Sequence, residues 1–311
     1  MVESDTTAAN MPNAENSTGH RRPFKLLGLH ALTLIHPGVG QVMGAIDLPV
    51  SRESTTDFPY IAGSSLKGAL RDVAQRQWGK PDEDPQKREN TTFGNTNDAA
   101  GSLILSDARL LLLPVRCIDN GFRYLTCPQI LTRFKLDLGL ADETLDLLPN
   151  AFSNLVGGSA AVCAKNPDKL ILEELVFDAD DSKAEHIAKV VDAIAKLAPV
   201  SALTREDLEK RITIVTDDEF GWFARNGLPV RMRNSLYDDS KTVKPGHLWS
   251  EEYLAPESLL YMLAGSRSAA CEPLARLKEL LEGDGYYLQV GGNETLGQGW
   301  FLTRFFGQTA P

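Results

Sequence analysis

Apolar residues repeat along the chain with two spacings, one typical of strands and one typical of helices. Residues 25–35 carry leucines at both even and odd positions, which predicts a first strand that is buried on both faces. Residues 36–60 hold three prolines and three glycines, so we expect a long loop, of the kind that is usually functional or disordered. A helix over residues 64–78 follows, because the apolar residues from Leu66 to Val73 recur at i, i+3, i+4 and i+7.

The rest of the chain shows the same two spacings. Residues 182–197 have a clear helical pattern with a proline just beyond it, and Thr204 with Asp207 resembles a capping box at the start of a short helix. Leucines predict a late helix over residues 274–281, ended by a glycine. Further strands are expected at residues 102–115 (one or two strands), 170–177 (a strand or a hairpin arm), 211–216, 230–237, 286–290 and 300–306.

The order of these elements predicts an α+β fold. A strand, long loop, helix and strand near the start, and a helix, strand, glycine loop and strand near the end, suit a ferredoxin-like core. We expect one domain over residues 23–311, with insertions at about residues 80–97 and 117–210. Residues 1–22 are polar and have no apolar run, so they predict a disordered N-terminal tail.

Charge restricts the classes of function. The formal net charge of −10 argues against non-specific nucleic-acid binding, because such binding draws its affinity from neutralising phosphates. The acidic residues cluster, however, so a basic stripe on an acidic body would still allow contact with RNA. The cations expected in that stripe are Arg52, Lys67, Arg71, Arg109, Arg116, Arg231 and Arg233.

The chain has neither a signal peptide nor an apolar stretch long enough to cross a membrane, so we expect a soluble, cytoplasmic protein without a membrane partner. Its cysteines are widely spaced and include no C-x-x-C pair, which argues against a zinc or redox site. They are Cys117, Cys127, Cys163 and Cys271.

The start of the helix at residues 64–78 has the composition of an anion site. Gly63 permits a sharp entry, and Ser64 or Ser65 can cap the first turn. The remaining N–H groups and the helix dipole then favour a phosphate, with Lys67 and Arg71 one turn apart on the same face. An ordinary capped amphipathic helix is the alternative. The segment is not a nucleotide-binding P-loop, which needs Lys and then Ser or Thr after its last glycine.

Five segments in a fixed order resemble the RAMP superfamily of CRISPR proteins, and within it the backbone subunits of Cmr-type, or type III-B, effector complexes. They are His36-Pro-Gly-Val-Gly40, residues 45–53, residues 64–71, residues 101–116 and the glycine loop Gly291-Gly-Asn-Glu-Thr-Leu-Gly-Gln-Gly299. The resemblance covers roughly residues 24–306. It implies a single RAMP domain with an RRM-like, ferredoxin-like palm and insertions called fingers and thumb.

Asp47 is the leading candidate for catalysis. It lies between glycines and a proline on a loop, where an aspartate can bind a divalent cation or orient a 2′-hydroxyl, or can merely bond its own turn. The resemblance implies that Asp47 is catalytic and binds a metal, Mg²⁺ or Mn²⁺. His36 is the second candidate, since an imidazole can act as acid or base near neutral pH. Glu251 and Tyr253 match a family segment that approaches the same site.

The resemblance also implies an RNA-binding surface. Its expected members are Ser64, Ser65, Lys67, Arg71, Arg52, Arg231, Arg233, Gly291, Gly292, Gly297 and Gly299. The glycine loop would let backbone approach a ligand closely, beside the start of the helix; a tight structural hairpin is the alternative. Its spacing is not that of a dinucleotide-binding fingerprint.

Two functions remain open from the sequence. In the first, the chain binds CRISPR RNA together with further copies of itself in a helical filament and with other Cmr-complex subunits. It then cleaves complementary target RNA at regular intervals, as a metal-dependent endoribonuclease that uses the 2′-hydroxyl for attack. In the second, it is a non-catalytic RNA-binding scaffold of the same kind of complex. An unrelated RRM-like factor that binds cellular RNA would require the ordered motifs to be coincidence.

Overall fold

A computed structural model describes residues 22–78, 85–95, 100–119, 121–141, 152, 160–163 and 168–308. The tail expected at residues 1–22 lies outside this part of the chain except for Arg22, and so do parts of both expected insertions. Within the described residues, no helix is long and apolar enough to span a membrane.

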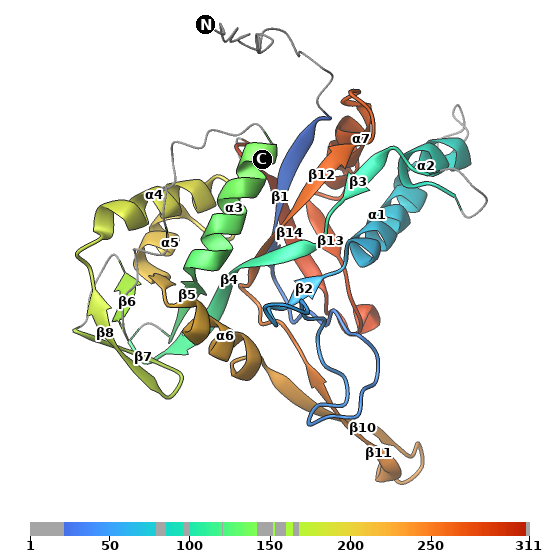
Figure 1. The fold of residues 1–311 in the computed structure, drawn as a ribbon. Coiled ribbons are helices and arrows are strands. Elements are labelled where there is room, and N and C mark those ends of the chain that lie inside the picture. Colours follow the sequence, from blue (N-terminus) through green and yellow to red (C-terminus); the bar gives the residue numbers. More distant parts are fainter. Residues whose placement is uncertain are drawn as a thin grey trace, which may run out of the picture.

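Most strands join one large mixed sheet, and a separate hairpin extends from it (Figure 1). The strands of the sheet are β1 (Phe24–Ala31), β2 (Tyr60–Ile61), β3 (Leu103–Leu105), β4 (Ala108–Cys117), β5 (Gly121–Thr126), β6 (Ala160–Cys163), β7 (Lys169–Leu172), β8 (Leu175–Asp180), β9 (Ile212–Ile214), β12 (Leu259–Ser266), β13 (Tyr287–Gln289) and β14 (Trp300–Phe305). The hairpin consists of β10 (Val230–Leu236) and β11 (Val243–Glu252). The helices are α1 (Gly63–Gln77), α2 (Pro85–Phe93), α3 (Pro128–Leu140), α4 (Ala184–Ala195), α5 (Arg205–Arg211), α6 (Asp217–Asn226) and α7 (Glu272–Gly283).

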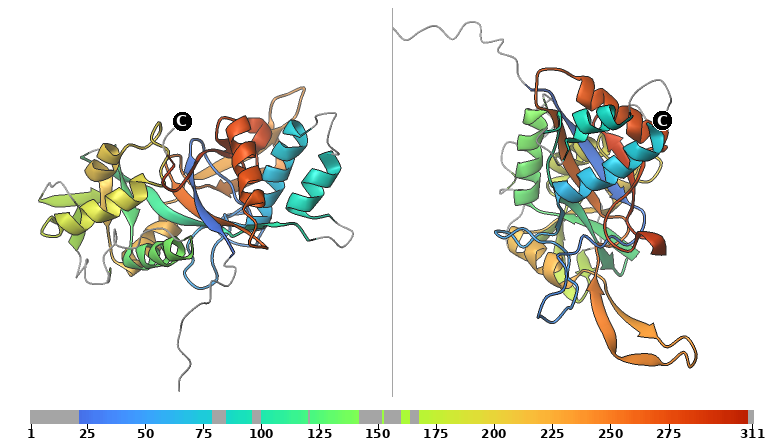
Figure 2. Two further views of the ribbon diagram at one scale, coloured as in Figure 1. Left: turned by 90° about the horizontal axis from the view of Figure 1, so that it is seen from above. Right: turned by 90° about the vertical axis from the view of Figure 1, so that its right-hand side faces the viewer.

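The first half of the sheet is antiparallel and runs in the order β13-β14-β1-β12-β4. Leu26, Leu27 and Leu29 of β1 are fully buried, because helices cover both faces of the strand. Helices α1 and α7 lie side by side on one face, and α3 lies on the other (Figure 2). Gly28 allows the chain to cross β1 closely: a Cβ there would lie 2.6 Å from the carbonyl oxygen of Leu197.

The second half of the sheet runs in the order β4-β5-β9-β6-β8-β7. Strand β7 returns to β4 through a bridge between Cys117 and Leu172, so these strands close on themselves. The β5–β9 and β6–β8 pairs are parallel, which makes the whole sheet mixed. Helices α4 and α5 pack at this end of the molecule (Figure 1).

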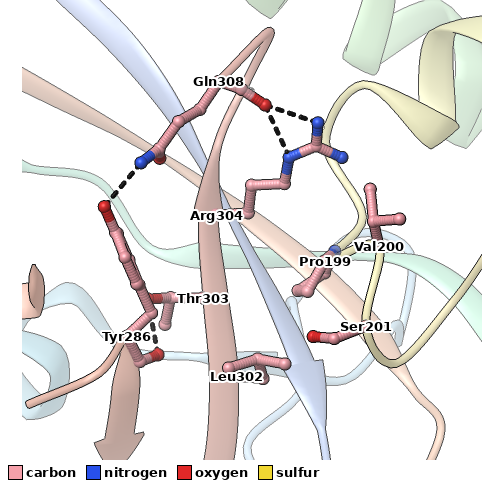
Figure 3. A pocket seen from close by; sticks show the side chains of 8 residues that line it. All are labelled: Pro199, Val200, Ser201, Tyr286, Leu302, Thr303, Arg304 and Gln308. Atoms are coloured by element: carbon pink, nitrogen blue, oxygen red, sulfur yellow. Dashed lines mark hydrogen bonds between the residues drawn. The ribbon is translucent and has the colours of Figure 1, made fainter. Parts of the chain in front are cut away.

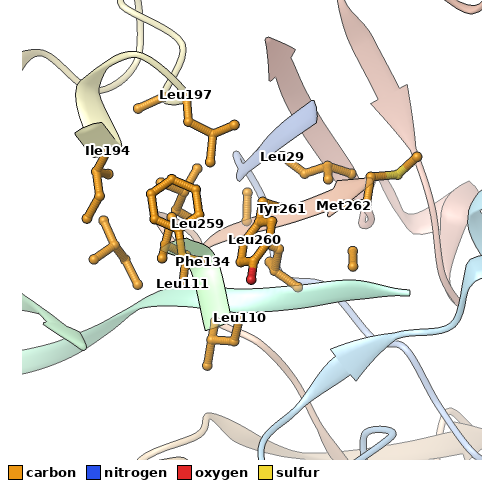
Figure 4. Packing of buried hydrophobic residues seen from close by; sticks show 14 of the residues in the cluster. Leu29, Leu110, Leu111, Phe134, Ile194, Leu197, Leu259, Leu260, Tyr261 and Met262 are labelled. Carbon is orange, nitrogen blue, oxygen red and sulfur yellow. The ribbon is translucent and has the colours of Figure 1, made fainter. Parts of the chain in front are cut away.

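One hydrophobic cluster joins the two halves (Figure 4). Phe134 of α3 packs edge-on against Tyr261 of β12, with the ring centroids 5.2 Å apart. The Tyr261 hydroxyl donates to the buried carboxylate of Asp137 at 2.8 Å, and Arg109 of β4 pairs with the same oxygen at 2.8 Å. Since a buried charge must be paired, this contact fixes α3 on the sheet.

Most predicted elements are present. The helices expected near residues 64–78, 182–197 and 274–281 are confirmed as α1, α4 and α7, and residues 170–177 form the β7–β8 hairpin. The Thr204 and Asp207 side chains make the reciprocal capping box at the start of α5.

One prediction of extent was wrong. The first strand ends at Ala31 rather than Ile35, because Ile35 makes only an isolated bridge to Leu254 beside the β11–β12 connection. The stretch at residues 80–97 contains a helix, α2, which is tied to α1 through Arg71 and Glu89. Helices α2, α3 and α6 and strands β2, β5, β6, β11 and β12 were not predicted at all. The boundaries of the insertions stay predictions.

Candidate functional site

The long loop between β1 and β2 and the β10–β11 hairpin extend from the same end of the molecule (Figure 1, Figure 2). Asp47 on this loop lies against Ser250 of β11. Ser250 donates to Asp47 Oδ2 from its backbone N–H at 2.8 Å and from its hydroxyl at 2.9 Å. These bonds favour the charged carboxylate and lower the pKa of Asp47. Both Ser250 bonds end on Oδ2, and no described residue outside Asp47 donates a hydrogen bond to Oδ1. Oδ2 is therefore held, while Oδ1 stays available.

The backbone that follows the aspartate is held by the same stretch of β11. The Leu48 N–H donates to the Ser250 carbonyl, and the Leu48 carbonyl accepts from the Glu252 N–H, both at 3.0 Å. The Glu252 carboxylate accepts from the Val50 N–H at 3.0 Å and pairs with Arg52 at 2.7 Å. Tertiary contacts with residues 250–253, which we call the β11 segment, therefore set the position of the loop.

His36 also binds the β11 segment. Its Nδ1 lies 2.7 Å from the Glu252 carbonyl oxygen, which assigns a proton to Nδ1 as donor. The ring packs at a tilt against the Tyr253 ring, 5.5 Å between centroids. Its Nε2 faces Gly38, where a Cβ would lie 2.5 Å away. The predicted histidine thus joins the site, although its ring is mostly buried.

Glu251 is the centre of a buried polar cluster, which we call the Glu251 cluster. Its carboxylate accepts from Trp249 Nε1 at 2.7 Å, from Arg233 Nη1 at 3.0 Å and from Asn293 Nδ2 at 2.9 Å, and also from the Tyr253 hydroxyl. Burial would raise the pKa of Glu251, but these donors outweigh it and bring the pKa to about 2. Because its lone pairs are occupied, Glu251 is placed to hold structure rather than to move protons.

Tyr253 is fully buried, and its hydroxyl donates to Glu251. Burial and the neighbouring carboxylate raise the pKa of Tyr253. Glu251, Tyr253, His36 and Asp47 therefore all lie along the β11 segment. Their catalytic roles stay predictions.

The glycine loop closes over His36. Gly291 has a φ of +107°, and a Cβ there would lie 3.0 Å from the His36 carbonyl oxygen. The Gly292 N–H donates to that oxygen at 3.0 Å. Gly297 and Gly299 also adopt left-handed conformations, which favour glycine. The glycine loop thus holds His36 against the β11 segment. Its contact with RNA stays a prediction.

The predicted cap of α1 is wrong. The helix begins after Ala62, with no side-chain cap, and Ser64 and Ser65 are exposed within its first turn. Instead, Asp107 from the β3–β4 connection accepts a hydrogen bond from the Gly63 N–H at 2.8 Å. The Asp107 carboxylate therefore binds one of the backbone N–H groups that were expected to bind phosphate.

The two cations of α1 have different surroundings. Arg71 donates to Glu89 at 2.7 Å and to the Gly94 carbonyl oxygen, so its guanidinium binds α2 and the residue after it. Lys67 has no ion pair among the described residues. It lines an open polar cleft together with Arg71 and Arg267. Lys67 is therefore the more available cation for an anionic ligand.

Most cations of the expected basic stripe form ion pairs within the chain, and whether they contact RNA stays a prediction. The pairs are Arg52–Glu252, Arg71–Glu89, Arg109–Asp137, Arg116–Glu173 and Arg233–Glu251. Arg231 of β10 is exposed and has no ion pair in the described chain. Among the predicted cationic RNA contacts, Arg231 and Lys67 are those without an ion pair in the described chain.

The described residues contain no group of three or more His, Cys, Asp and Glu side chains that could hold a metal ion. Asp47 still fits a hydrated divalent cation, because Mg²⁺ is commonly bound through one or two carboxylates, water and substrate phosphates. Its available Oδ1 could supply that single carboxylate ligand.

A small cavity between β14 and the chain after α4 shares no residue with this site (Figure 3). Arg304 there donates to the carbonyl oxygens of Ala195 and Ala198, at 2.9 and 2.6 Å, and to that of Gln308 at 3.0 Å. Burial lowers the pKa of Arg304. Because cations favour helix C-termini, Arg304 stabilises the end of α4.

Several residues of the site were missed from the sequence. Ser250 and Asp47 are 203 positions apart, and nothing in a serine beside two glutamates indicates a partner. Asn293 could have been noticed from its residue type. Asparagine adopts a left-handed conformation more readily than most non-glycine residues, and Asn293 in the glycine loop has a φ of +63°. Trp249 was also missed: its indole donates to Glu251.

Comparisons with known proteins show which family the chain resembles. A model of the RAMP superfamily matches residues 29–302. The chain is 35% identical over 290 residues to the CRISPR system Cmr endoribonuclease Cmr4 of Pyrococcus furiosus, which covers 88% of this chain and 93% of the relative. The crystal structure of oligomeric Cmr4 from Pyrococcus furiosus has a TM-score of 0.68 at 29% identity and covers 92% of this chain and 98% of that one. The cryo-EM structure of type III-B Cmr-beta bound to cognate target RNA has a TM-score of 0.70 over 91% and 96% of the two chains; at 21% identity it shows a shared fold.

Proposed function

Because the chain belongs to the RAMP superfamily, we propose that it is a backbone subunit of a type III-B CRISPR effector and cleaves complementary target RNA. The Pyrococcus furiosus relative is named an endoribonuclease of the Cmr system, which supports the activity. The observation that carries the proposal here is the geometry of Asp47. Its carboxylate is held by Ser250 on one oxygen and has its other oxygen available at the end of the molecule where loop and hairpin meet.

The chemistry proposed at Asp47 is orientation of the attacking group. RNA carries its own nucleophile, the 2′-hydroxyl, and needs in-line geometry at the adjacent phosphate. A fixed, ionised carboxylate can accept a hydrogen bond from that hydroxyl and hold it in place. The products by this route would be a cyclic phosphate and a 5′-hydroxyl.

Metal dependence forms part of the proposal. Asp47 would hold a divalent cation, Mg²⁺ or Mn²⁺, through its available oxygen. When bound, the cation would neutralise charge on the scissile phosphate. His36, Glu251 and Tyr253 would then act mainly by fixing the β11 segment and the glycine loop around it, since their polar atoms already contact one another or the backbone.

The proposed partners are CRISPR RNA, target RNA, further copies of the chain and other Cmr-complex subunits. Base pairing would supply sequence recognition, while the protein contacts backbone and shape. Lys67 and Arg231 are the proposed phosphate contacts. The oligomeric crystal form of the Pyrococcus furiosus relative supports self-association, and a head-to-tail contact that does not close would give a helical filament. A cytoplasmic location is proposed with these partners.

The proposal also includes a ferredoxin-like palm. We assign the ferredoxin-like palm to β1, α1, β4, β12, α7 and β14. Their spatial order, β14-β1-β12-β4 with antiparallel neighbours, is that of a split β-α-β-β-α-β motif.

The test is an assembled complex with labelled target RNA and a titration of Mg²⁺ or Mn²⁺. Asp47→Ala should slow cleavage by at least about 100-fold, the usual contribution of a positioned acid or base, and should leave guide and target binding nearly unchanged. Asp119→Ala, which removes an exposed carboxylate in the β4–β5 turn, is the matched control. Normal cleavage by Asp47→Ala would exclude this site, and a wild-type complex that never cuts would favour a scaffold.

A further inference from the structure

Ser250 contacts the carboxylate of Asp47 more closely than any other described residue does. The serine is buried in β11, and its hydroxyl both donates to Asp47 Oδ2, at 2.9 Å, and accepts from the Asp47 N–H, at 3.0 Å. A hydroxyl has one proton and two lone pairs, so it can fill both roles at once. The backbone N–H of Ser250 adds a second donor to the same carboxylate oxygen.

The remaining freedom of Asp47 lies in its side chain. The adjacent Leu48 is bonded on both sides to the β11 segment, which fixes the backbone. An aspartate carboxylate, however, rotates in a broad two-fold torsional well, so a fixed backbone alone does not fix the plane of the carboxylate. The two donors of Ser250 converge on Oδ2 and remove that freedom.

The Ser250–Asp47 contact lies on the opposite face of β11 from the side chain of Glu251. Successive residues of a strand point to opposite faces. Ser250 and Glu252 both contact the loop that carries Asp47, whereas Glu251 between them contacts Arg233 and Asn293. A small change at Ser250 should therefore alter the loop side and leave the cluster intact.

We propose that Ser250 is a positioning residue for RNA cleavage: its hydroxyl holds Asp47 Oδ2 so that Oδ1 is presented to the RNA. This rests on the proposed function of Asp47. The hydroxyl acts through the carboxylate and does not touch the reacting atoms. Its loss should slow cleavage without abolishing it, because the backbone N–H of residue 250 still binds Asp47.

The experiment compares variants in the fully assembled, guide-loaded complex under single-turnover conditions with saturating target. Ser250→Ala should cut about 10- to 100-fold more slowly, the scale on which small misplacement of a reacting group acts, with target affinity within about twofold of wild type. Ser250→Thr keeps the hydroxyl and should restore most of the rate. Ser235→Ala removes a hydroxyl from β10 of the same hairpin and should have no effect.

A double variant separates this proposal from the function it rests on. Asp47→Ala with Ser250→Ala should be no slower than Asp47→Ala alone, because the hydroxyl then has nothing to position. A wild-type rate in Ser250→Ala, an equal loss in Ser250→Thr, or failure of Ser250→Ala to assemble would each overturn the positioning role while Asp47 remains essential. Normal cleavage by Asp47→Ala alone would instead overturn the proposed function, and the role of Ser250 with it.

Discussion

Two charged regions of the molecule differ in how completely their groups are paired. In the Glu251 cluster, the carboxylate accepts from donors on β10, β11 and the glycine loop, and only 3% of the residue is exposed. At the start of α1, Asp107 caps Gly63 from an exposed position and Lys67 has no ion pair among the described residues. A buried charge must be satisfied, whereas an exposed one interacts freely with water or ligand.

The difference separates structural charges from charges that can bind. Glu251 fixes the position of the hairpin relative to the glycine loop and has no lone pair to spare. Asp47 lies between the two extremes, half-buried and held on one oxygen only. Availability of lone pairs, rather than residue type, thus distinguishes the two carboxylates that the sequence placed in one site.

The largest effect on stability is expected in the Glu251 cluster. Glu251→Gln would replace a carboxylate with a group that offers one acceptor oxygen and an N–H₂ facing Arg233. We expect the free energy of unfolding to fall by about 2–4 kcal/mol, since breaking a buried pair leaves the partner charge uncompensated. Thermal or urea unfolding of the purified chain measures the loss.

Acid unfolding is the control for that assignment. The pKa of Glu251 is lowered from 4.5 to about 2, so the folded state holds fewer protons than the unfolded state between these values. Stability from this carboxylate is full above pH 4.5 and is lost as the pH falls toward 2. Wild type should lose stability over that range more steeply than Glu251→Gln. Parallel curves would mean that Glu251 is not the charged centre of the cluster.

A smaller effect should separate the two cations of α1. Lys67→Ala should weaken RNA binding for all guide sequences and reduce the salt dependence by about 0.7 to 0.9 units of slope, the value for one phosphate contact. Arg71→Ala should leave that slope unchanged and lower stability by about 1 kcal/mol, because its guanidinium pairs with Glu89. Binding titrations at several salt concentrations, with unfolding curves, distinguish the two.

Lys189→Ala, which removes an exposed cation from α4, controls for net charge in that comparison. If Arg71→Ala reduces the slope as much as Lys67→Ala, then Arg71 leaves Glu89 when RNA binds. Ion pairing in the free chain would then not decide which cation of α1 binds RNA.

The sequence was sufficient where a local pattern decides the structure. The apolar periodicities of α1, α4 and α7 and the Thr204–Asp207 capping box need no distant partner, and they were predicted. The RAMP resemblance, argued over roughly residues 24–306, is confirmed by the match at residues 29–302.

Prediction failed where distant residues decide the outcome. Arg52 was expected to contact RNA, but it pairs with Glu252, 200 residues away. Its neighbour Glu53 binds Arg133 of α3, a helix that was itself missed. Short-range sequence patterns contain no information on such pairs, and buried charges take whichever partner the fold brings to them.

The smallest effect tests the start of α1 itself. Ser64 is exposed inside the helix and makes no capping bond, so Ser64→Ala should change stability by no more than about 0.3 kcal/mol, and in the favourable direction because alanine is the better helix former. Asp107→Ala removes the carboxylate that binds the Gly63 N–H, and should cost about 0.5–1 kcal/mol as the loss of a cap at a helix N-terminus. Matched urea unfolding curves measure both. A larger loss in Ser64→Ala than in Asp107→Ala would mean that the helix is capped from within, as the sequence first indicated.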